Sequence, residues 1–469
     1  MVLRALLAAL VLSTAAVPSN AQQPTDAAAR VDEVFREWNS TTSPGCAVEA
    51  AIGGRSVASR AYGMSDLEHG IRNSPATIFE AGSVSKQFTA AAIVLLALDG
   101  KLSLDDDVRR FVPEIPDYGH TITLRHLLTH TSGLRDWGSV ASITGWGRSN
   151  RTHDHEHVVD ILSRQRALNY TPGERYSYTN SGYNLLAVIV DRVSGMSFAE
   201  FSKQRIFEPL GLTDTQWRVD YRRIVPGRSS AYASRGDTFI IDRPIENVHG
   251  NGGLLTTVGD LVKWSRALAT GELGGQRFVE MMHQQGVLNS GETITYASGL
   301  TVGRYHNLPE VSHTGATSGY RAFLARYPDQ DLDVAVLCNI GSVNPGSVGH
   351  AVADILLGNA LQRVASPARQ QNAGADRPQP LQPTAAQLAE YAGEYYSPDV
   401  EMSLVVTVED GELHVFRRPA SDMVLRPTAA DTFTGQLGMV RFIRGADGRV
   451  AEMSVSISRV DDLRFDRVR

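Results

Sequence analysis

Lysine is scarce in this sequence. Only four of its 45 basic residues are lysine (Lys86, Lys101, Lys203 and Lys263), and the others are arginine. Arginine keeps its proton in proteins, so nearly all the basic side chains are excluded as proton acceptors in catalysis. The formal net charge of −6 favours neither nucleic acid nor an anionic membrane surface as a partner.

Cysteine is equally rare. Cys46 and Cys338 are the two in the chain, and two cysteines cannot form a tetrahedral zinc site without several histidines. Neither has the surroundings of a catalytic thiol, and both lie in apolar, strand-like runs. A disulfide and a pair of buried free thiols are both open interpretations.

Long apolar runs are missing after the N-terminus, where residues 1–21 have the pattern of a secretory signal. Arg4 is followed by an apolar core, Ala5 to Val17, and by the small residues Ser19-Asn20-Ala21. The core is too short to span a bilayer as a mature helix. We therefore expect an exported, soluble chain, periplasmic or extracellular, without stable membrane insertion.

The order of the remaining patterns predicts an α+β domain over residues 27–362. Two strand-like runs, 46–52 and 55–62, precede a long and mostly helical middle, and three strand candidates close the domain at 311–314, 320–327 and 332–337. This order predicts one antiparallel sheet flanked by helices. Helices are expected at 27–38, 89–98, 158–168, 183–193, 198–211, 258–269 and 348–361, and a loop at 139–150.

A second domain is expected at the C-terminus. Residues 365–384 are rich in Pro, Ala, Gln and Gly and predict a linker. Residues 385–469 contain short alternating runs, punctuated by Asp410-Gly411 and Asp447-Gly448. This pattern predicts a small all-β barrel, and it contains no candidate catalytic constellation.

Ser83 and Lys86 are the first candidates for chemistry. They lie three residues apart before an apolar run, so a helix there places both side chains on one face. A serine hydroxyl needs an adjacent base to become a nucleophile. Lysine can be that base if burial or nearby charge lowers its pKa.

Two further segments complete a possible acyl-transfer site. Tyr178-Thr179-Asn180 stands at a turn before a helix, and His313-Thr314-Gly315-Ala316 stands on the first closing strand. Taken alone, the first is typical of a helix cap and the second of a turn. Their occurrence in this order within one domain favours a catalytic interpretation.

In combination these segments resemble the serine hydrolase family of class C β-lactamases, D-alanyl-D-alanine carboxypeptidases, D-aminopeptidases and related esterases. The C-terminal barrel is similar to the lipocalin-like domains of some peptidase-type members. The matching text is Glu80-Ala-Gly-Ser83-Val-Ser-Lys86, Leu127-Leu-Thr-His-Thr-Ser-Gly-Leu134, Pro172-Gly-Glu-Arg-Tyr-Ser-Tyr178-Thr-Asn180-Ser-Gly-Tyr183, Glu208-Pro-Leu-Gly-Leu212, Gly252-Gly-Leu-Leu-Thr-Thr257 and His313-Thr-Gly-Ala316.

The resemblance implies a role for each matching residue, and no cofactor or metal. Ser83 forms an acyl-enzyme, and Lys86 and Tyr178 share the role of base. Lys86 either holds Tyr178 as a phenolate or relays its proton. Asn180 binds Lys86 and the substrate amide, and the backbone N–H groups of Ser83 and Ala316 form the oxyanion hole.

His313 departs from the family pattern, because β-lactamases of this family usually carry lysine there. Histidine is mostly neutral at pH 7, which weakens recognition of a substrate carboxylate. We therefore expect an esterase or a D-amino-acid-directed peptidase acting on a small molecule or peptide, with weak β-lactamase activity at most. The alternatives are a penicillin-binding sensor without turnover and a true class C-type β-lactamase.

Other motifs favour structural roles. His153, His155 and His157 alternate like a metal tract, but they stand at the start of a predicted helix, where residues two apart diverge. His130 and Ser132 are interpreted as a helix stop rather than a catalytic dyad. The Gly-x-Ser-x-Gly elbow is absent, which argues against an α/β-hydrolase fold.

Overall fold

The computed structural model describes residues 24–362, 383–417 and 421–468. The predicted signal at 1–21 and nearly all of the predicted linker at 365–384 lie outside these residues. Within them, no helix combines the length and the apolar character that crossing a membrane requires.

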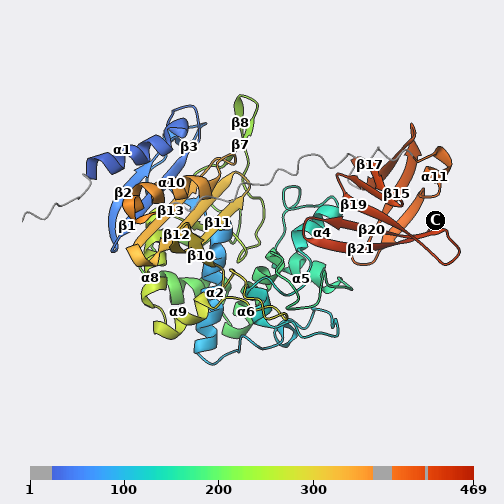
Figure 1. The fold of residues 1–469 in the computed structure, drawn as a ribbon, viewed down its shortest axis with the longest axis horizontal. Helices are drawn as coiled ribbons and strands as arrows, with labels where there is room; N and C mark the ends of the chain where they lie inside the picture. Colours follow the sequence, from blue (N-terminus) through green and yellow to red (C-terminus); the bar gives the residue numbers. More distant parts are fainter. Residues whose placement is uncertain (1–23, 363–382, 418–420, 469) are drawn as a thin grey trace, which may run out of the picture.

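The first domain is built on a six-stranded antiparallel sheet with helices on both faces (Figure 1). The strand order is β10 (Thr301–Tyr305), β11 (Leu308–Thr317), β12 (Tyr320–Tyr327), β13 (Leu332–Cys338), β1 (Cys46–Ile52) and β2 (Arg55–Ala61). The sequence-based expectation of an α+β fold with one antiparallel sheet is confirmed.

Alternation along the buried strand β13 divides the core into two layers, because successive side chains point to opposite faces. Val334 and Val336 pack with helices α1 (Pro24–Val34) and α10 (Pro345–Leu357). Ala335 and Leu337 belong to the larger core on the other face, with helices α2 (Ser85–Leu98) and α8 (Val258–Thr270).

The sheet register also decides between the two interpretations of the cysteines. Cys46 on β1 lies directly opposite Cys338 on β13, and both are fully buried. The structure joins them in a disulfide.

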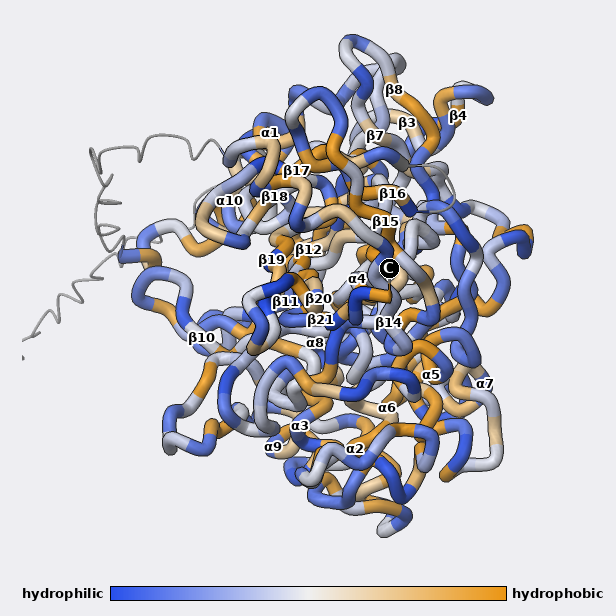
Figure 2. The backbone as a smooth tube through the Cα atoms, turned by 90° about the vertical axis from the view of Figure 1, so that its right-hand side faces the viewer, coloured by the Kyte–Doolittle hydropathy of each residue, from blue (hydrophilic) through white to orange (hydrophobic). Residues whose placement is uncertain are grey.

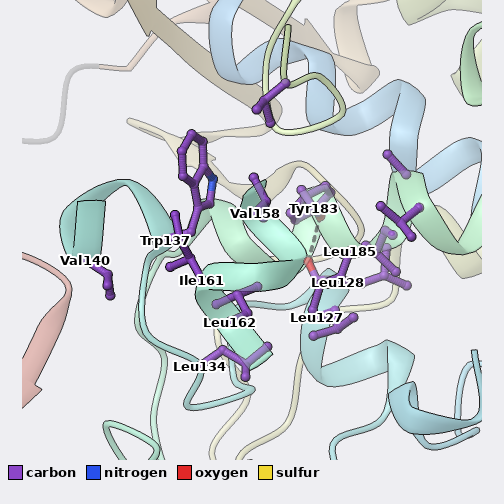
Figure 3. Packing of buried hydrophobic residues seen from close by; sticks show 14 of the residues in the cluster. Leu127, Leu128, Leu134, Trp137, Val140, Val158, Ile161, Leu162, Tyr183 and Leu185 are labelled. Atoms are coloured by element: carbon purple, nitrogen blue, oxygen red, sulfur yellow. Dashed lines mark hydrogen bonds between the residues drawn. The ribbon is translucent and has the colours of Figure 1, made fainter. Parts of the chain in front are cut away.

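The helical middle surrounds α2. Its helices are α3 (Leu124–Leu128), α4 (Trp137–Ile143), α5 (His155–Ser163), α6 (Asn180–Ser194), α7 (Phe198–Ser202) and α9 (Gly275–His283). Leucines of α3, α5 and α6 interdigitate beneath Trp137, and the Tyr183 hydroxyl donates to the Leu128 carbonyl oxygen at 2.7 Å (Figure 3). This packing fixes the start of α6, where the predicted site residue Asn180 lies.

Short strands complete this domain. They are β3 (Met64–Asp66) with β4 (Ile71–Arg72), β5 (Phe79–Glu80) with β9 (Leu254–Thr256) and β6 (Gln216–Trp217), and β7 (Tyr232–Arg235) with β8 (Thr238–Ile241). Strand β5 leads directly to Ser83, so its position decides where the predicted nucleophile lies.

The C-terminal domain is a closed eight-stranded antiparallel barrel preceded by α11 (Ala385–Ala389). Seen from the barrel side, hydrophilic and hydrophobic segments alternate along the tube (Figure 2). Asp410 and Gly411 form the turn between the second and third strands with positive φ, as expected for such a hairpin. The architecture fits a lipocalin-like domain. Its strands are β14 (Gly393–Ser397), β15 (Met402–Glu409), β16 (Glu412–Arg417), β17 (Ser421–Ala429), β18 (Thr432–Gly435), β19 (Gly438–Arg444), β20 (Val450–Ile457) and β21 (Val460–Arg467).

Two local expectations differ from the structure. The helix expected at 198–211 is α-helical only over α7, continues as a π-helix over Lys203–Phe207 and ends there. The predicted loop at 139–150 is wrong in its first part, because α4 begins at Trp137 and is capped by the Asp136 carboxylate, which accepts from the Ser139 N–H at 3.0 Å. Glycine and serine in this helix concealed its apolar spacing. Helix α9 and edge strand β10 were not predicted, and neither shows a long apolar run.

Candidate active site

Ser83 lies in a 3₁₀ turn, Gly82–Val84, that runs into α2. Two glycines let this turn pack against β11. Gly82 has a φ of 51°, and a Cβ on it would lie 2.7 Å from the Ala316 nitrogen. A Cβ on Gly315 would lie 2.1 Å from the Ala81 carbonyl oxygen and 3.1 Å from the Ser83 nitrogen. This close approach brings the backbone nitrogens of Ser83 and Ala316 into one region.

Buried ion pairs hold the strand before Ser83. The Glu80 carboxylate accepts from Arg218 Nε at 3.0 Å and from Arg228 Nη2 at 3.2 Å. The side chains of Glu80 and Arg218 are at most 1 % exposed. Because a carboxylate buried at this depth needs such partners, the network fixes β5 and with it the turn that carries Ser83.

Lys86 is fully buried on the first turn of α2. Its Nζ lies 3.2 Å from Ser83 Oγ, 3.0 Å from Asn180 Oδ1 and 2.6 Å from the Asn251 carbonyl oxygen. Burial lowers the pKa of Lys86 well below its ordinary value, and the charge of Arg148 adds to this effect. A neutral amine is therefore favoured at this position.

Tyr178 directly precedes α6, whose N-cap is Thr179. Lys86 Nζ lies 4.8 Å from the centre of the Tyr178 ring. The Tyr178 hydroxyl is buried and has no hydrogen-bond partner among the described residues. Burial raises the pKa of Tyr178 above its ordinary value, although nearby Ser83 and Arg459 act in the opposite direction. The phenol therefore keeps its proton and has a free hydrogen-bonding capacity.

Asn180 begins α6 and faces Lys86. Its backbone N–H donates to Asp136 Oδ2 at 2.8 Å, while its side-chain oxygen accepts from Lys86. Asp136 caps α4 as well, so one carboxylate ties two helices together at the site.

His313 lies on β11 in a neutral form. Its Nδ1 donates to the Thr314 carbonyl oxygen at 2.5 Å, and its Nε2 accepts from the Tyr296 hydroxyl at 2.9 Å. Burial lowers the pKa of His313 to about 4. The imidazole therefore carries no charge at neutral pH.

Ser83, Tyr178 and His313 border one cavity of about 640 Å³. Lys86 is fully buried and is not among its lining residues. Asn180 borders an adjoining cavity of about 850 Å³ together with Ala316. A third cavity, of about 990 Å³, lies between α4, α5 and the barrel and contains none of the predicted site residues. The first cavity is lined by Ser83, Tyr178, His313, Thr314, Gly315, Ala316, Arg321, Ser342, Val343, Asn344, Pro345 and Arg459.

Sequence reasoning missed several neighbours of this site. Asn251 contributes a backbone carbonyl, for which no side-chain signal exists. His130, interpreted as a helix stop, has a positive φ and packs its ring 4.2 Å from that of Tyr178. Tyr296 holds His313, and Arg459 comes from the barrel, where no site residue was expected.

The three alternating histidines do not converge. His153 contacts the Trp146 carbonyl oxygen, His155 contacts the His249 carbonyl oxygen, and His157 contacts Asp154 at the helix cap. Across the described ranges there is no group of three or more His, Cys, Asp or Glu arranged to hold a metal ion.

Comparison with known families gives two matches that cover most of the chain. Residues 28–358 match the model of the beta-lactamase family, and residues 377–467 match a domain of unknown function, DUF3471. Penicillin-binding protein 4* of Bacillus subtilis (strain 168) is 33% identical over 316 residues, which is 62% of this chain and 67% of that protein.

Solved structures share the fold. The octameric penicillin-binding protein homologue from Pyrococcus abyssi aligns with a TM-score of 0.61 and 24% identity, covering 90% of this chain and 95% of that one. The D-amino acid amidase from Ochrobactrum anthropi SV3 aligns with a TM-score of 0.59 and 22% identity, covering 71% of this chain and 97% of that one.

Proposed function

The chain belongs to the beta-lactamase family, whose members are generally serine hydrolases, and from this premise we propose that it cleaves esters or amides through an acyl-enzyme on Ser83. The observation that carries the proposal is the set of three contacts around Lys86 Nζ. A neutral amine has two N–H donors, and two of the contacts are carbonyl oxygens, those of Asn180 and Asn251. The nitrogen lone pair is then left for the third contact, Ser83 Oγ.

In the first step, Lys86 accepts the proton of Ser83 while Oγ attacks the substrate carbonyl carbon. The lowered pKa of Lys86 supports this role, because it favours the neutral amine that can accept a proton. The negative charge that develops on the carbonyl oxygen is met by the backbone N–H groups of Ser83 and Ala316.

In the second step, Tyr178 delivers a proton to the leaving group. Of the two roles considered for this tyrosine, the raised pKa favours proton relay over a standing phenolate. Its unpartnered hydroxyl is available for the leaving atom, and Lys86 replaces the proton that it gives. Water then attacks the acyl-enzyme by the reverse path and releases the acid.

His313 bears on the substrate class. A neutral imidazole held by Tyr296 and Thr314 offers no permanent cation for the carboxylate of a β-lactam. We propose an esterase or a D-amino-acid-directed peptidase, with β-lactam hydrolysis as a weak activity at most. The amidase with the same fold supports this class by analogy alone.

The test is hydrolysis of p-nitrophenyl butyrate, D-amino-acid amides and a cephalosporin by one preparation. The parent chain should cleave at least one of them, and Ser83→Ala should reduce that rate at least about 1,000-fold. Ser290→Ala, which changes an exposed serine, should retain the parent rate. Equal rates for Ser83→Ala and the parent would refute the assignment, and stoichiometric labelling without turnover would indicate a sensor.

We also propose that the protein is exported. The pattern around Arg4 and Ala21 and the disulfide between Cys46 and Cys338 support an oxidising compartment. N-terminal sequencing of the protein from its native host should find a chain that begins after Ala21. A full-length chain with two free thiols would contradict the proposal.

A further inference from the structure

The charged side chains that line the cavity containing Ser83 are all positive. Its charged lining residues are Arg321 and Arg459, and no aspartate or glutamate is among the described residues that border it. The same two arginines also border the adjoining cavity that contains Asn180. Both guanidinium groups therefore stand where the two cavities meet, beside Ala316.

Arg459 is supplied by the barrel. Ser458 and Arg459 form the two-residue turn between β20 and β21, in which Ile457 pairs with Val460. The guanidinium lies 4.9 Å from the centre of the Tyr178 ring. It is paired only loosely, with Asp136 Oδ2 at 3.7 Å, and is 38 % exposed. It can therefore bind an additional anion.

The turn is held firmly against the first domain. The Arg459 carbonyl oxygen accepts from the Asp136 N–H at 3.2 Å and from Asn169 Nδ2 at 3.0 Å. The buried Arg135 pairs with Asp399 of the barrel at 2.7 Å, with side chains 2 % and 5 % exposed. A buried pair of this kind fixes the geometry between the two domains, so the position of Arg459 is built into the fold.

Arg321 is supplied by β12. Its Nη1 donates to the carbonyl oxygens of Ser318 and Tyr320 at 2.6 and 2.7 Å. Among the residues that the structure describes, no carboxylate lies within ion-pair distance of this guanidinium. Its guanidinium is thus positioned by neutral acceptors. The Asp242 carboxylate attracts it without forming an ion pair, so it can bind a further anion.

We propose that Arg459 and Arg321 bind an anionic group on the substrate, so that the preferred substrates are esters or amides with a carboxylate near the cleaved bond. This inference rests on the proposed function of the same site. Two arginines, one of them from the C-terminal barrel, take the place of the cation that His313 does not provide. The inference therefore revises the expectation, drawn from His313 alone, that the carboxylate of a β-lactam is poorly bound. The barrel is thereby a determinant of specificity and not merely an appendage.

The test compares two substrates that differ in charge, mono-p-nitrophenyl adipate and its methyl ester. For Arg459→Gln and for Arg321→Gln, the ratio of kcat/KM for the anionic over the neutral substrate should fall about tenfold or more, mainly through KM. Arg449→Gln, which changes an exposed arginine at the opposite end of β20, should keep the parent ratio. The use of a ratio removes any common effect of Arg459 on Tyr178. An unchanged ratio in both variants would overturn the inference.

A binding measurement keeps this inference separate from the catalytic proposal. Ser83→Ala should bind monomethyl adipate in calorimetry, and Ser83→Ala with Arg459→Gln should bind it at least about tenfold more weakly. Equal affinities, or no binding to Ser83→Ala, would overturn the anion site whatever the turnover. If Ser83→Ala instead releases p-nitrophenol like the parent, the nucleophile assignment fails and the anion site is judged by binding alone.

Discussion

Asn180→Asp tests the role of Lys86 as a base that is neutral before the reaction. The substitution puts a carboxylate oxygen where Asn180 Oδ1 now lies, 3.0 Å from Lys86 Nζ. Coulomb's law gives about 5.5 kcal/mol for opposite charges at that distance with an effective dielectric constant of about 20. Desolvation of the new carboxylate and its repulsion by Asp136 oppose this attraction. We take about half, ~2.7 kcal/mol, as the net stabilisation of protonated Lys86, which is about 100-fold in its protonation equilibrium.

The sign of the effect on the pH profile follows from the direction of the pKa change. In the parent chain burial lowers the pKa of Lys86 well below its ordinary value, which favours the base form. The new carboxylate raises that pKa, so the lysine stays protonated to a higher pH. The rising limb of kcat/KM against pH should therefore move upward by about two pH units, with a loss of up to about 100-fold on that limb that shrinks as the pH rises above the new pKa.

The assay is the pH dependence of kcat/KM for p-nitrophenyl butyrate between pH 5 and 10. Asn180→Ala is the matched control, because it removes the amide oxygen without adding a charge. It should lower the rate without moving the rising limb upward. If the rising limb of Asn180→Asp overlays that of the parent, Lys86 is not the group that titrates and the reasoning is refuted.

Three further predictions concern the leaving group, stability and the thiols. Tyr178→Phe should slow amide cleavage about 10–100-fold more than p-nitrophenyl ester cleavage, because p-nitrophenolate leaves without a proton; equal losses in kcat/KM would contradict a role as proton donor. Glu80→Gln removes the carboxylate that pairs with the buried Arg218 and with Arg228 and leaves Arg218 only the longer pair with Glu246 at 3.6 Å. It should lower the free energy of unfolding by about 3–5 kcal/mol, measured by urea denaturation; a loss under about 1 kcal/mol would contradict the network. Thiol titration in denaturant should detect two thiols after reduction and none before, as the bond between Cys46 and Cys338 requires; two thiols before reduction would contradict that bond.

Much of the fold could be predicted because the pattern was local. Strand β1 over 46–52 and the body of α6, expected at 183–193, were visible in apolar periodicity and in turn residues. Helix α4 was missed because Gly138 and Ser139 dilute its apolar face, while its cap at Asp136 depends on a single side chain. Whether Cys46 and Cys338 are bonded depends on the register between β1 and β13, which lie far apart in the sequence. That register cannot be predicted from composition.

In the candidate site, too, some contacts could be predicted from the sequence and others depend on the tertiary structure. Ser83 and Lys86 share one helix turn, so their spacing in the sequence already predicted their contact. Asn251 acts through its backbone, and any residue type can supply a carbonyl oxygen. Arg459 reaches Tyr178 only because the barrel docks on the first domain, and no pattern within the barrel predicts that docking. Tertiary placement therefore supplied the contacts that local sequence could not.

The most direct test of the account is the location of the covalent intermediate. The full chain is mixed with an ester that acylates quickly and hydrolyses slowly, quenched in acid, digested and analysed by mass spectrometry. We predict the mass of the acyl group on the peptide that contains Ser83, and none on Ser83→Ala. An acyl group on another residue of the parent chain, or equal labelling of Ser83→Ala, would contradict the assignment of Ser83 as the nucleophile.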